Sequence, residues 1–360
     1  MNTGMCLGTS AKDIMGESKM GQRVALLYNL KHEAQESDDD PPDLLAELDT
    51  ASTIEAIRDA LIQAGFEVSC LEGTPAALFT LLHGNFDLAF NICEGYRGRN
   101  REAQIPALLE MIGLPYTGSD VLTLAIALDK PTTKIILLHA GIPTPRFQVF
   151  PDAAHPLDPS LTFPLIVKPA HEGSSMGIST NSRVDDEASL RKQVNFICQS
   201  YKQPALVEEF VAGREFTIGI VGNGATAVTF PIMEIDFSKV PSTANNMYTY
   251  QYKKEWTARE NFLCPAPINE ELAAVMRGYA LRAFSALGCR DFARVDFRLS
   301  EDGIPYVIEI NPLPGLAPAY SDFPVSAEAV GMSYPDLIAL LADTALSRIR
   351  GVSLLAKTAT

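Results

Sequence analysis

The chain has 360 residues, of which 47% are hydrophobic and 20% charged, and its formal net charge is −15. This composition is typical of a globular protein large enough for two or three lobes. The acidic balance argues against a nucleic-acid surface, which needs clustered basic residues, and no apolar run is long enough to span a membrane. The acidic net charge does not exclude phosphate ligands, because binding of a phosphate depends on a few local lysines and a metal ion.

The first twenty residues lack the apolar core of a signal peptide, so we expect a disordered extension there, or a start site at Met20. The six cysteines show no CxxC spacing, which predicts reduced, mostly buried thiols in a cytoplasmic protein. The five histidines form no HExxH or HxxH pair, so a zinc site is not expected.

The first third of the chain predicts a parallel α/β lobe, with strands at 23–27, 66–71 and 86–92. An acidic stretch at 31–43 is too polar to pack, and a capping box of Ser52 and Glu55 is expected to open the first helix. Ligands of parallel sheets bind at the carboxyl ends of the strands. Glu94 follows one such end and is therefore a candidate site residue, although a solvated loop carboxylate explains it equally well.

Further along, Ser119 is expected to cap a helix that ends at Leu128, and more helices are expected at 105–112, 132–139, 186–199, 270–287 and 333–349. Further strands are expected at 163–167, 178–180, 206–211, 215–221 and 227–235. The polar stretch 238–259 is long enough to be functional or disordered. We predict an extension (1–20), an N-terminal α/β domain (21–118), a central lobe (119–205) and a C-terminal lobe (206–360).

The Asp-Gly pair at 302–303 predicts a hairpin with a two-residue turn. That turn places Asp296 opposite Glu309 and Arg294 opposite Asn311, with all four side chains on one face. The other face then holds Val295, Phe297, Leu299, Ile308 and Ile310. Opposed carboxylates repel unless a cation lies between them, and carboxylate and amide oxygens suit Mg²⁺. A hairpin with an ordinary solvated face is the alternative.

Lys168 ends a predicted buried strand, and the flexible sequence Gly173-Ser174-Ser175-Met176-Gly177 follows it. A buried lysine is costly unless it points at an anion, and the N–H groups of such a loop can hold phosphates. The loop lacks the pattern of a Walker loop, and a plain β-turn is the alternative.

Several motifs occurring in order resemble the D-alanine–D-alanine ligases of the ATP-grasp superfamily. They are Lys168-Pro-x-x-Glu172-Gly-Ser-Ser-x-Gly177, Gly213-x-Glu215-Phe-Thr, Arg294-x-Asp296 and Glu309-x-Asn311-x-x-Pro-Gly315. With the sequence LPYTGS at 114–119 and Asp129-Lys130, the resemblance covers about 115–334. It implies an α/β ATP-grasp fold, in which an N-terminal parallel lobe accompanies two α+β lobes that clamp ATP.

The resemblance also implies roles for individual residues. The implied ATP site consists of Lys130, Lys168, the loop Glu172, Gly173, Ser174, Ser175 and Gly177, adenine contacts at Glu208, Phe210 and Val211, the ribose contact Glu215, and Lys253 near the transferred phosphate. The implied ligands of two Mg²⁺ (or Mn²⁺) ions are Asp296, Glu309 and Asn311. Arg294 and the Gly315 N–H are implied donors to the oxyanion of the reaction, and Ser174 is implied to position the first substrate.

Departures from the family pattern cluster on the amino-acid side. The family has a Ser/Glu pair after the first strand that orients the first substrate's ammonium, for which Glu33 or Glu36 is a candidate replacement. The family's His-Gly is Glu94-Gly95 here, and the aromatic residue after the site lysine is Lys254. Tyr320 or Ser321 is a candidate to face the second substrate's carboxylate.

The leading hypothesis is therefore an ATP- and Mg²⁺-dependent ligase that joins two amino acids through an acyl phosphate. D-alanyl-D-alanine, and with it a role in cell-wall peptidoglycan synthesis, is the first guess. The alternatives are an ATP-grasp ligase with another amino acid, peptide or metabolite as acceptor, and a non-catalytic ATP-binding module. We expect small amino-acid partners, no nucleic acid and no membrane, and the resemblance suggests a homodimer.

Overall fold

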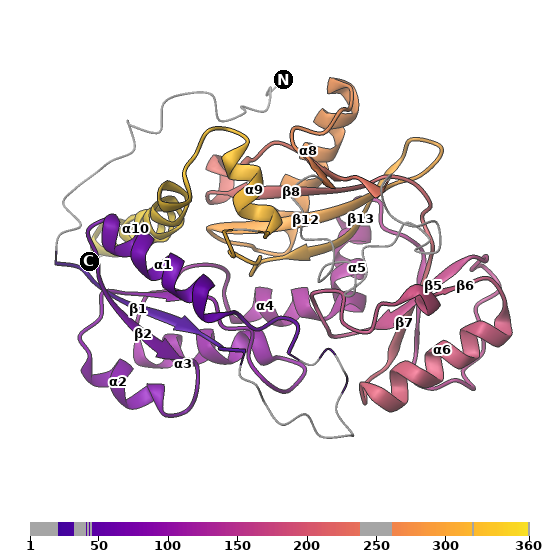
Figure 1. Ribbon diagram of the computed structural model, residues 1–360, viewed down its shortest axis with the longest axis horizontal. Coiled ribbons are helices and arrows are strands. Elements are labelled where there is room, and N and C mark those ends of the chain that lie inside the picture. Colours follow the sequence, from indigo (N-terminus) through magenta and orange to yellow (C-terminus); the bar gives the residue numbers. More distant parts are fainter. Residues whose placement is uncertain are drawn as a thin grey trace.

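The computed structural model describes residues 21–31, 41, 43, 45–237, 261–318 and 320–358, with side chains described as far as residue 351. Three lobes, each with its own β-sheet, are visible in Figure 1. The predictions for residues 1–20, for Glu33 and Glu36, and for 238–259 with Lys253 and Lys254 lie outside the described residues.

The N-terminal lobe has the predicted parallel sheet, in the order β2–β1–β3. Its strands and helices are β1 (Arg23–Tyr28), α1 (Ala51–Gln63), β2 (Glu67–Glu72), α2 (Ala77–His83), β3 (Leu88–Asn91) and α3 (Gln104–Ile112). The predicted capping box at Ser52 is wrong, because α1 begins at Ala51, two residues earlier than a cap at Ser52 requires. Thr50 is its N-cap, and the Thr50 side chain accepts a hydrogen bond from the Thr53 N–H.

Two consecutive helices, α4 (Val121–Leu128) and α5 (Lys130–His139), lead from this lobe to the central one. Each begins at an aspartate, since Asp120 accepts from the Thr123 N–H and Asp129 from the Thr132 N–H. Ser119 is therefore not the predicted cap. Its hydroxyl instead accepts a hydrogen bond from the Arg290 N–H, which ties the start of α4 to the C-terminal lobe.

The central lobe is a four-stranded antiparallel sheet in the order β4–β7–β5–β6. Its strands are β4 (Phe147–Phe150), β5 (Leu165–Pro169), β6 (Arg183–Val184) and β7 (Ala205–Glu209), and α6 (Glu187–Ser200) packs against them (Figure 1). The strand predicted at 178–180 is wrong. That segment leads into a short 3₁₀ turn, Thr180–Ser182, in which the Ser179 side chain caps the backbone.

The C-terminal lobe is a six-stranded antiparallel sheet in the order β11–β10–β8–β12–β13, with β9 pairing β8. Its elements are β8 (Glu215–Val221), β9 (Val228–Thr229), β10 (Met233–Ile235), β11 (Phe262–Leu263), α8 (Glu270–Ala286), β12 (Phe292–Leu299) and β13 (Pro305–Asn311). The single strand predicted at 227–235 is broken into β9 and β10. Pro231 lies in the break, and it has no N–H for a strand ladder.

The last two helices, α9 (Asp322–Glu328) and α10 (Tyr334–Thr358), return towards the N-terminal lobe (Figure 1). Leu337 and Leu341 of α10 share one buried core with Ile57 and Leu61 of α1, so the end of the chain closes the N-terminal lobe. The predicted division by residue ranges, which gives α10 to the C-terminal lobe, stays a prediction.

Within the described part of the chain, no helix has the length and apolar character needed to cross a membrane. The five described cysteines are all free thiols, as predicted. Only Cys93 and Cys289 are buried and Cys70 is exposed, so the prediction of mostly buried thiols was too general.

Candidate active site

The hairpin of β12 and β13 has the predicted residue pairs at the site, but its turn and its register differ from the prediction. Arg294 pairs with Asn311 and Asp296 with Glu309. The turn has three residues, because the Ser300 N–H bonds to the Ile304 carbonyl, and this shifts the pairing by one. A β-bulge between Asp296 and Phe297 shifts it back.

The bulge changes the position of one side chain. Ile308 was predicted on the core face of the hairpin, and that prediction is wrong. Val307 is the partner of Phe297 and is fully buried, whereas Ile308 lines the site cavity. An apolar side chain is thereby added to a wall that otherwise carries Asp296 and Glu309.

The Asp296 carboxylate is surrounded by donors. Arg294 binds it in a bidentate manner, with Nε 2.8 Å from Oδ1 and Nη2 2.7 Å from Oδ2. The Thr217 hydroxyl donates to Oδ1 at 2.6 Å, and Asn311 Nδ2 donates to Oδ2 at 3.0 Å. Burial alone would lower the pKa of Arg294, but the neighbouring Asp296 raises it, so the guanidinium stays charged.

These residues also fit a hard divalent cation. Asp296, Glu309 and Asn311 present carboxylate and amide groups from two adjacent strands, and oxygen donors of this kind are what Mg²⁺ prefers. Lys130 Nζ lies 3.9 Å from Glu309 Oε2 and places a positive charge beside these ligands.

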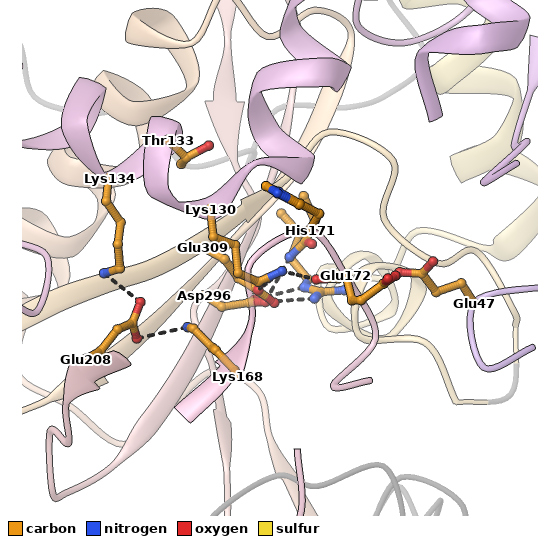
Figure 2. A network of polar contacts seen from close by, with 12 residues as sticks. Glu47, Lys130, Thr133, Lys134, Lys168, His171, Glu172, Glu208, Asp296 and Glu309 are labelled. Atoms are coloured by element: carbon orange, nitrogen blue, oxygen red, sulfur yellow. Dashed lines mark hydrogen bonds and ion pairs between the residues drawn. The ribbon is translucent and has the colours of Figure 1, made fainter. Parts of the chain in front are cut away.

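A buried charge triad lies beside the hairpin (Figure 2). Glu208 on β7 lies between two lysines, with Oε1 3.0 Å from Lys134 Nζ and Oε2 2.9 Å from Lys168 Nζ. Burial alone would raise the pKa of Glu208, but the two lysines outweigh it and the pKa lies below its usual value. Burial lowers the pKa of Lys134 to about 8.

Lys134 is a site residue that the sequence reasoning missed. It lies four residues after Lys130, on the same face of α5, and this spacing was the signal that could have found it. The Lys134 side chain also donates to the Thr144 hydroxyl and lies 5.5 Å from the centre of the Phe147 ring.

Two members of the triad, Lys168 and Glu208, line a cavity between the central and C-terminal lobes. Of the predicted nucleotide residues, those that line it are Lys130, Lys168, Glu172, Gly173, Ser175, Glu208, Phe210, Val211 and Glu215. The wall offers lysines for phosphate oxygens, a mainly apolar surface for a base, and carboxylates that can accept hydrogen bonds from ribose hydroxyls. These are the groups that a nucleoside triphosphate needs. Arg298, which was also missed, bridges this wall, because it is 3.1 Å from Glu215 and lies over the Phe210 ring.

The loop after β5 contacts both sides of the site. The Lys130 ammonium donates to the Glu172 carbonyl, and Gln203 donates to the Glu172 carboxylate at 2.6 Å. Ser174 and Ser175 both have left-handed backbones, with φ of 46° and 61°. The Gly177 N–H, which the sequence assigned to phosphate, donates instead to the buried Asp43 carboxylate.

A second chamber adjoins the hairpin on the N-terminal side. The predicted residues that line it are Glu94, Lys130, Glu172, Gly173, Ser174, Arg294, Glu309, Asn311 and Gly315. Glu47 and Glu102 line it as well, and both were missed. Glu47 comes just before α1 and after the polar stretch 31–43.

The electrostatics of this chamber are dominated by carboxylates. Arg101 is bound to Glu47 and lies 3.1 Å from Glu172. Burial raises the pKa of Glu94 well above its usual value and that of Glu102 to about 8, and in both cases neighbouring carboxylates add to the effect.

Tyr320 and Ser321 line neither of the two cavities. Tyr320 is 44% exposed, and its hydroxyl lies near Asp49 and Thr53 of the N-terminal lobe. The Ser321 hydroxyl accepts from the Ala317 N–H at 3.1 Å and shapes the turn that carries Gly315.

Known proteins resemble this chain over most of its length. The family model described as D-ala D-ala ligase C-terminus matches residues 136–343. A D-alanine–D-alanine ligase of Bordetella pertussis is 35% identical over 80% of this chain and 88% of its own. An uncharacterized protein, y4sG, of Sinorhizobium fredii is 35% identical over 84% of this chain and 89% of its own.

A solved structure has the same architecture. It is a D-alanine–D-alanine ligase from Bacillus anthracis complexed with ATP, with a TM-score of 0.69 and 24% identity. The match covers 92% of this chain and 99% of that one, which confirms the predicted ATP-grasp fold.

Proposed function

Because the chain belongs to the D-alanine–D-alanine ligase family of ATP-grasp ligases, we propose that it uses ATP and Mg²⁺ to join two amino acids through an amide bond. D-alanyl-D-alanine is the first candidate product, with a role in cell-wall synthesis. We also propose that the protein acts in the cytoplasm and that it forms a homodimer.

The observation that carries the proposal is the convergence of two cavities on one hairpin. The residues that line both the cavity beside Lys168 and Glu208 and the carboxylate-lined chamber are Lys130, Glu172, Gly173, Arg294 and Glu309. A nucleotide in the first cavity and an amino acid in the second would therefore meet beside the hairpin residues Arg294 and Glu309. Ligases of this kind need that arrangement, since phosphoryl transfer depends mainly on positioning and charge neutralisation.

The side chains have separate tasks in the proposed reaction. Lys130 and Lys168 bind phosphate oxygens, and Glu208 holds Lys168 in place through their 2.9 Å contact. Asp296, Glu309 and Asn311 would hold Mg²⁺, and the ion would supply charge neutralisation for the transferred group.

The substrate carboxylate takes the γ-phosphoryl group, the amine of the second substrate attacks the resulting acyl phosphate, and inorganic phosphate leaves. Arg294 and the Gly315 N–H, which line the same chamber, donate to the oxyanion that develops during this attack.

The test is ADP release by the purified protein with Mg²⁺ and pairs of D- and L-amino acids. We expect release only with the correct amino acids, and loss of at least about a hundredfold in the Asp296→Asn variant, which removes a charged ligand. Turnover equal to the unmodified protein in that variant would refute the metal assignment. Absence of release with every pair would refute the ligase proposal.

A further inference from the structure

The cavity beside Lys168 and Glu208 is the proposed nucleotide cavity, and part of its wall comes from the segment that leads from β7 into β8. This segment contributes Phe210, Val211 and Glu215. Under the proposed function, the first two would contact the base and Glu215 would contact the ribose. These residues must keep their positions for a nucleotide to bind in one orientation.

One side chain of another strand, Arg298 of β12, contacts this segment at three points. Arg298 is the cross-strand neighbour of Glu215, and its Nη1 lies 3.1 Å from Glu215 Oε2. Its Nη2 donates to the Gly213 carbonyl at 3.0 Å, and its guanidinium carbon lies 5.2 Å from the centre of the Phe210 ring. A planar, rigid guanidinium thus contacts the turn, the carboxylate and the aromatic wall together.

These contacts lie in a buried and constrained part of the sheet. The Arg298 side chain is 10% exposed and that of Glu215 18%, so solvent screens the pair only weakly. Burial lowers the pKa of Arg298, and the Glu215 carboxylate opposes this effect. Gly213 has a φ of 127°, and a Cβ there would lie 2.1 Å from the Leu299 carbonyl oxygen. The turn that precedes Glu215 is therefore closely packed as well.

The position of Arg298 on its strand also connects it to the reacting end of the site. Alternate residues of a strand share one face, and Arg294, Asp296 and Arg298 all line the nucleotide cavity. Arg294 and Asp296 are the proposed oxyanion donor and metal ligand. Arg298, two residues further along, contacts the proposed ribose acceptor. One strand face therefore runs from the reacting end of the cavity to its ribose end.

We propose that Arg298 is a positioning residue, which holds the Glu215 carboxylate where it accepts hydrogen bonds from the ribose of the nucleotide. This inference rests on the proposed use of ATP and adds a determinant of nucleotide selectivity. A carboxylate has two oxygens with about four acceptor sites, so it can contact Arg298 and a ribose hydroxyl together. The arrangement selects ribonucleotides over deoxyribonucleotides.

The test is calorimetric titration of the full-length protein, in the presence of Mg²⁺, with ADP, 2′-deoxyADP and 3′-deoxyADP. ADP carries the same ribose as ATP and is not consumed during the measurement. We expect ADP to bind at least about tenfold more tightly than one of the deoxynucleotides, which is the value of one charge-assisted hydrogen bond. A smaller ratio for both deoxynucleotides would overturn the inference.

Arg298→Met removes the guanidinium and keeps a long apolar side chain. We expect it to lower the affinity ratio of ADP to deoxyADP by at least about threefold, because the acceptor is no longer held in place. Glu215→Gln should lower the ratio as well, and the double variant should lower it no further than Arg298→Met alone. A smaller fall in Arg298→Met contradicts the inference. Equal weakening of all three nucleotides, which a general structural role or direct attraction of phosphate would produce, contradicts it too.

Arg214→Met is the matched control. Arg214 also pairs with a glutamate, with Nε 2.6 Å from Glu234 Oε1, and its guanidinium carbon lies 5.0 Å from the centre of the Phe216 ring. Arg214 is not among the described residues that line the cavity. Its variant should keep the affinity ratio of the unmodified protein within about twofold. A fall as large as that in Arg298→Met would show that loss of any such pair has this effect, and the inference would fail.

Thermal unfolding serves as the folding control for each variant. If Arg298→Met does not fold, Arg298→Lys takes its place under the same threshold, since lysine leaves a cation beside Glu215 but lacks the planar fork.

The outcomes separate the inference from the proposed function. ADP release with amino acids, together with an unchanged ratio in Arg298→Met, overturns the inference and leaves the ligase intact. The titration needs no amino acid, so the affinity ratio decides the inference even if no amino acid triggers ADP release and the ligase proposal fails. Absence of ADP binding to the unmodified protein also overturns the inference.

Discussion

Replacing Lys134 by methionine tests whether the charge triad is as strongly coupled as its geometry indicates. The Lys134 side chain is 1% exposed and the Glu208 side chain 2%, and their charged atoms are 3.0 Å apart. Methionine fills most of the same volume, so the loss of packing is small. The change leaves Glu208 with Lys168 as its remaining cation in the triad.

The expected cost follows from that burial. Removal of one partner from a buried ion pair costs about 3–5 kcal/mol, because a charge is left insufficiently compensated. The lowered pKa of Glu208 agrees in direction, since the folded protein holds this carboxylate in its charged form. Lys134→Met should therefore reduce the free energy of unfolding by about 3–5 kcal/mol near pH 7.

The assay is urea unfolding followed by circular dichroism, with Lys134→Met, Glu208→Gln and the double variant in one cycle. We expect the two changes to couple by at least about 1.5 kcal/mol, because both remove the same contact. Lys192→Met, at an exposed position of α6, is the matched control and should change stability by less than about 0.5 kcal/mol. A loss below about 1 kcal/mol for Lys134→Met, or additive effects in the cycle, would contradict the reasoning.

Further predictions concern pH and backbone. The folded protein raises the pKa of Glu102 from 4.5 to about 8, so this group stabilises the fold fully below 4.5 and loses that contribution as pH rises through about 8. Glu102→Gln should remove this loss and unfold at a higher temperature than the unmodified protein at about pH 8.5; an unchanged pH profile would contradict it. Gly213→Ala should lower the unfolding temperature, because φ is 127° and a Cβ would lie 2.1 Å from the Leu299 carbonyl oxygen. Gly278→Ala, in open space on α8, should raise stability by about 0.5–1 kcal/mol, and a loss there would invalidate the comparison.

The order of strands and helices could be predicted because it depends on local periodicity. The strand predicted at 215–221 matches β8, and the helix predicted at 270–287 ends one residue too late. Ser52 misled the prediction of α1 because Thr50, two residues earlier, is equally able to cap it. A local pattern locates a helix more reliably than it selects between neighbouring caps.

The hairpin shows that correct prediction of one residue pair does not establish the turn or the orientation of every side chain. The pairing of Asp296 with Glu309 was predicted from a two-residue turn, and it holds because a three-residue turn and a bulge compensate each other. Nothing in the local sequence announces the bulge, so the orientation of Ile308 could not be predicted. β12 also pairs with β8, and the hairpin shares a buried core with α8, so contacts distant in sequence act on this pairing as well.

The carboxylates of the second chamber were the least predictable part of the site. Glu94 was a candidate from its place after a strand, but Glu47 and Glu102 reach it through a long connection and a short 3₁₀ turn. Contacts between residues so far apart in sequence depend on the tertiary fold. Lys134, in contrast, could have been predicted, because residues four apart lie on the same face of a helix and Lys130 was already a candidate.

The contact between Arg294 and Asp296 joins two residues that are proposed for different tasks. Asp296 is a proposed metal ligand and Arg294 a proposed oxyanion donor, and two hydrogen bonds hold their side chains together. A substitution at either residue should therefore disturb the position of the other, so the two tasks cannot be altered independently.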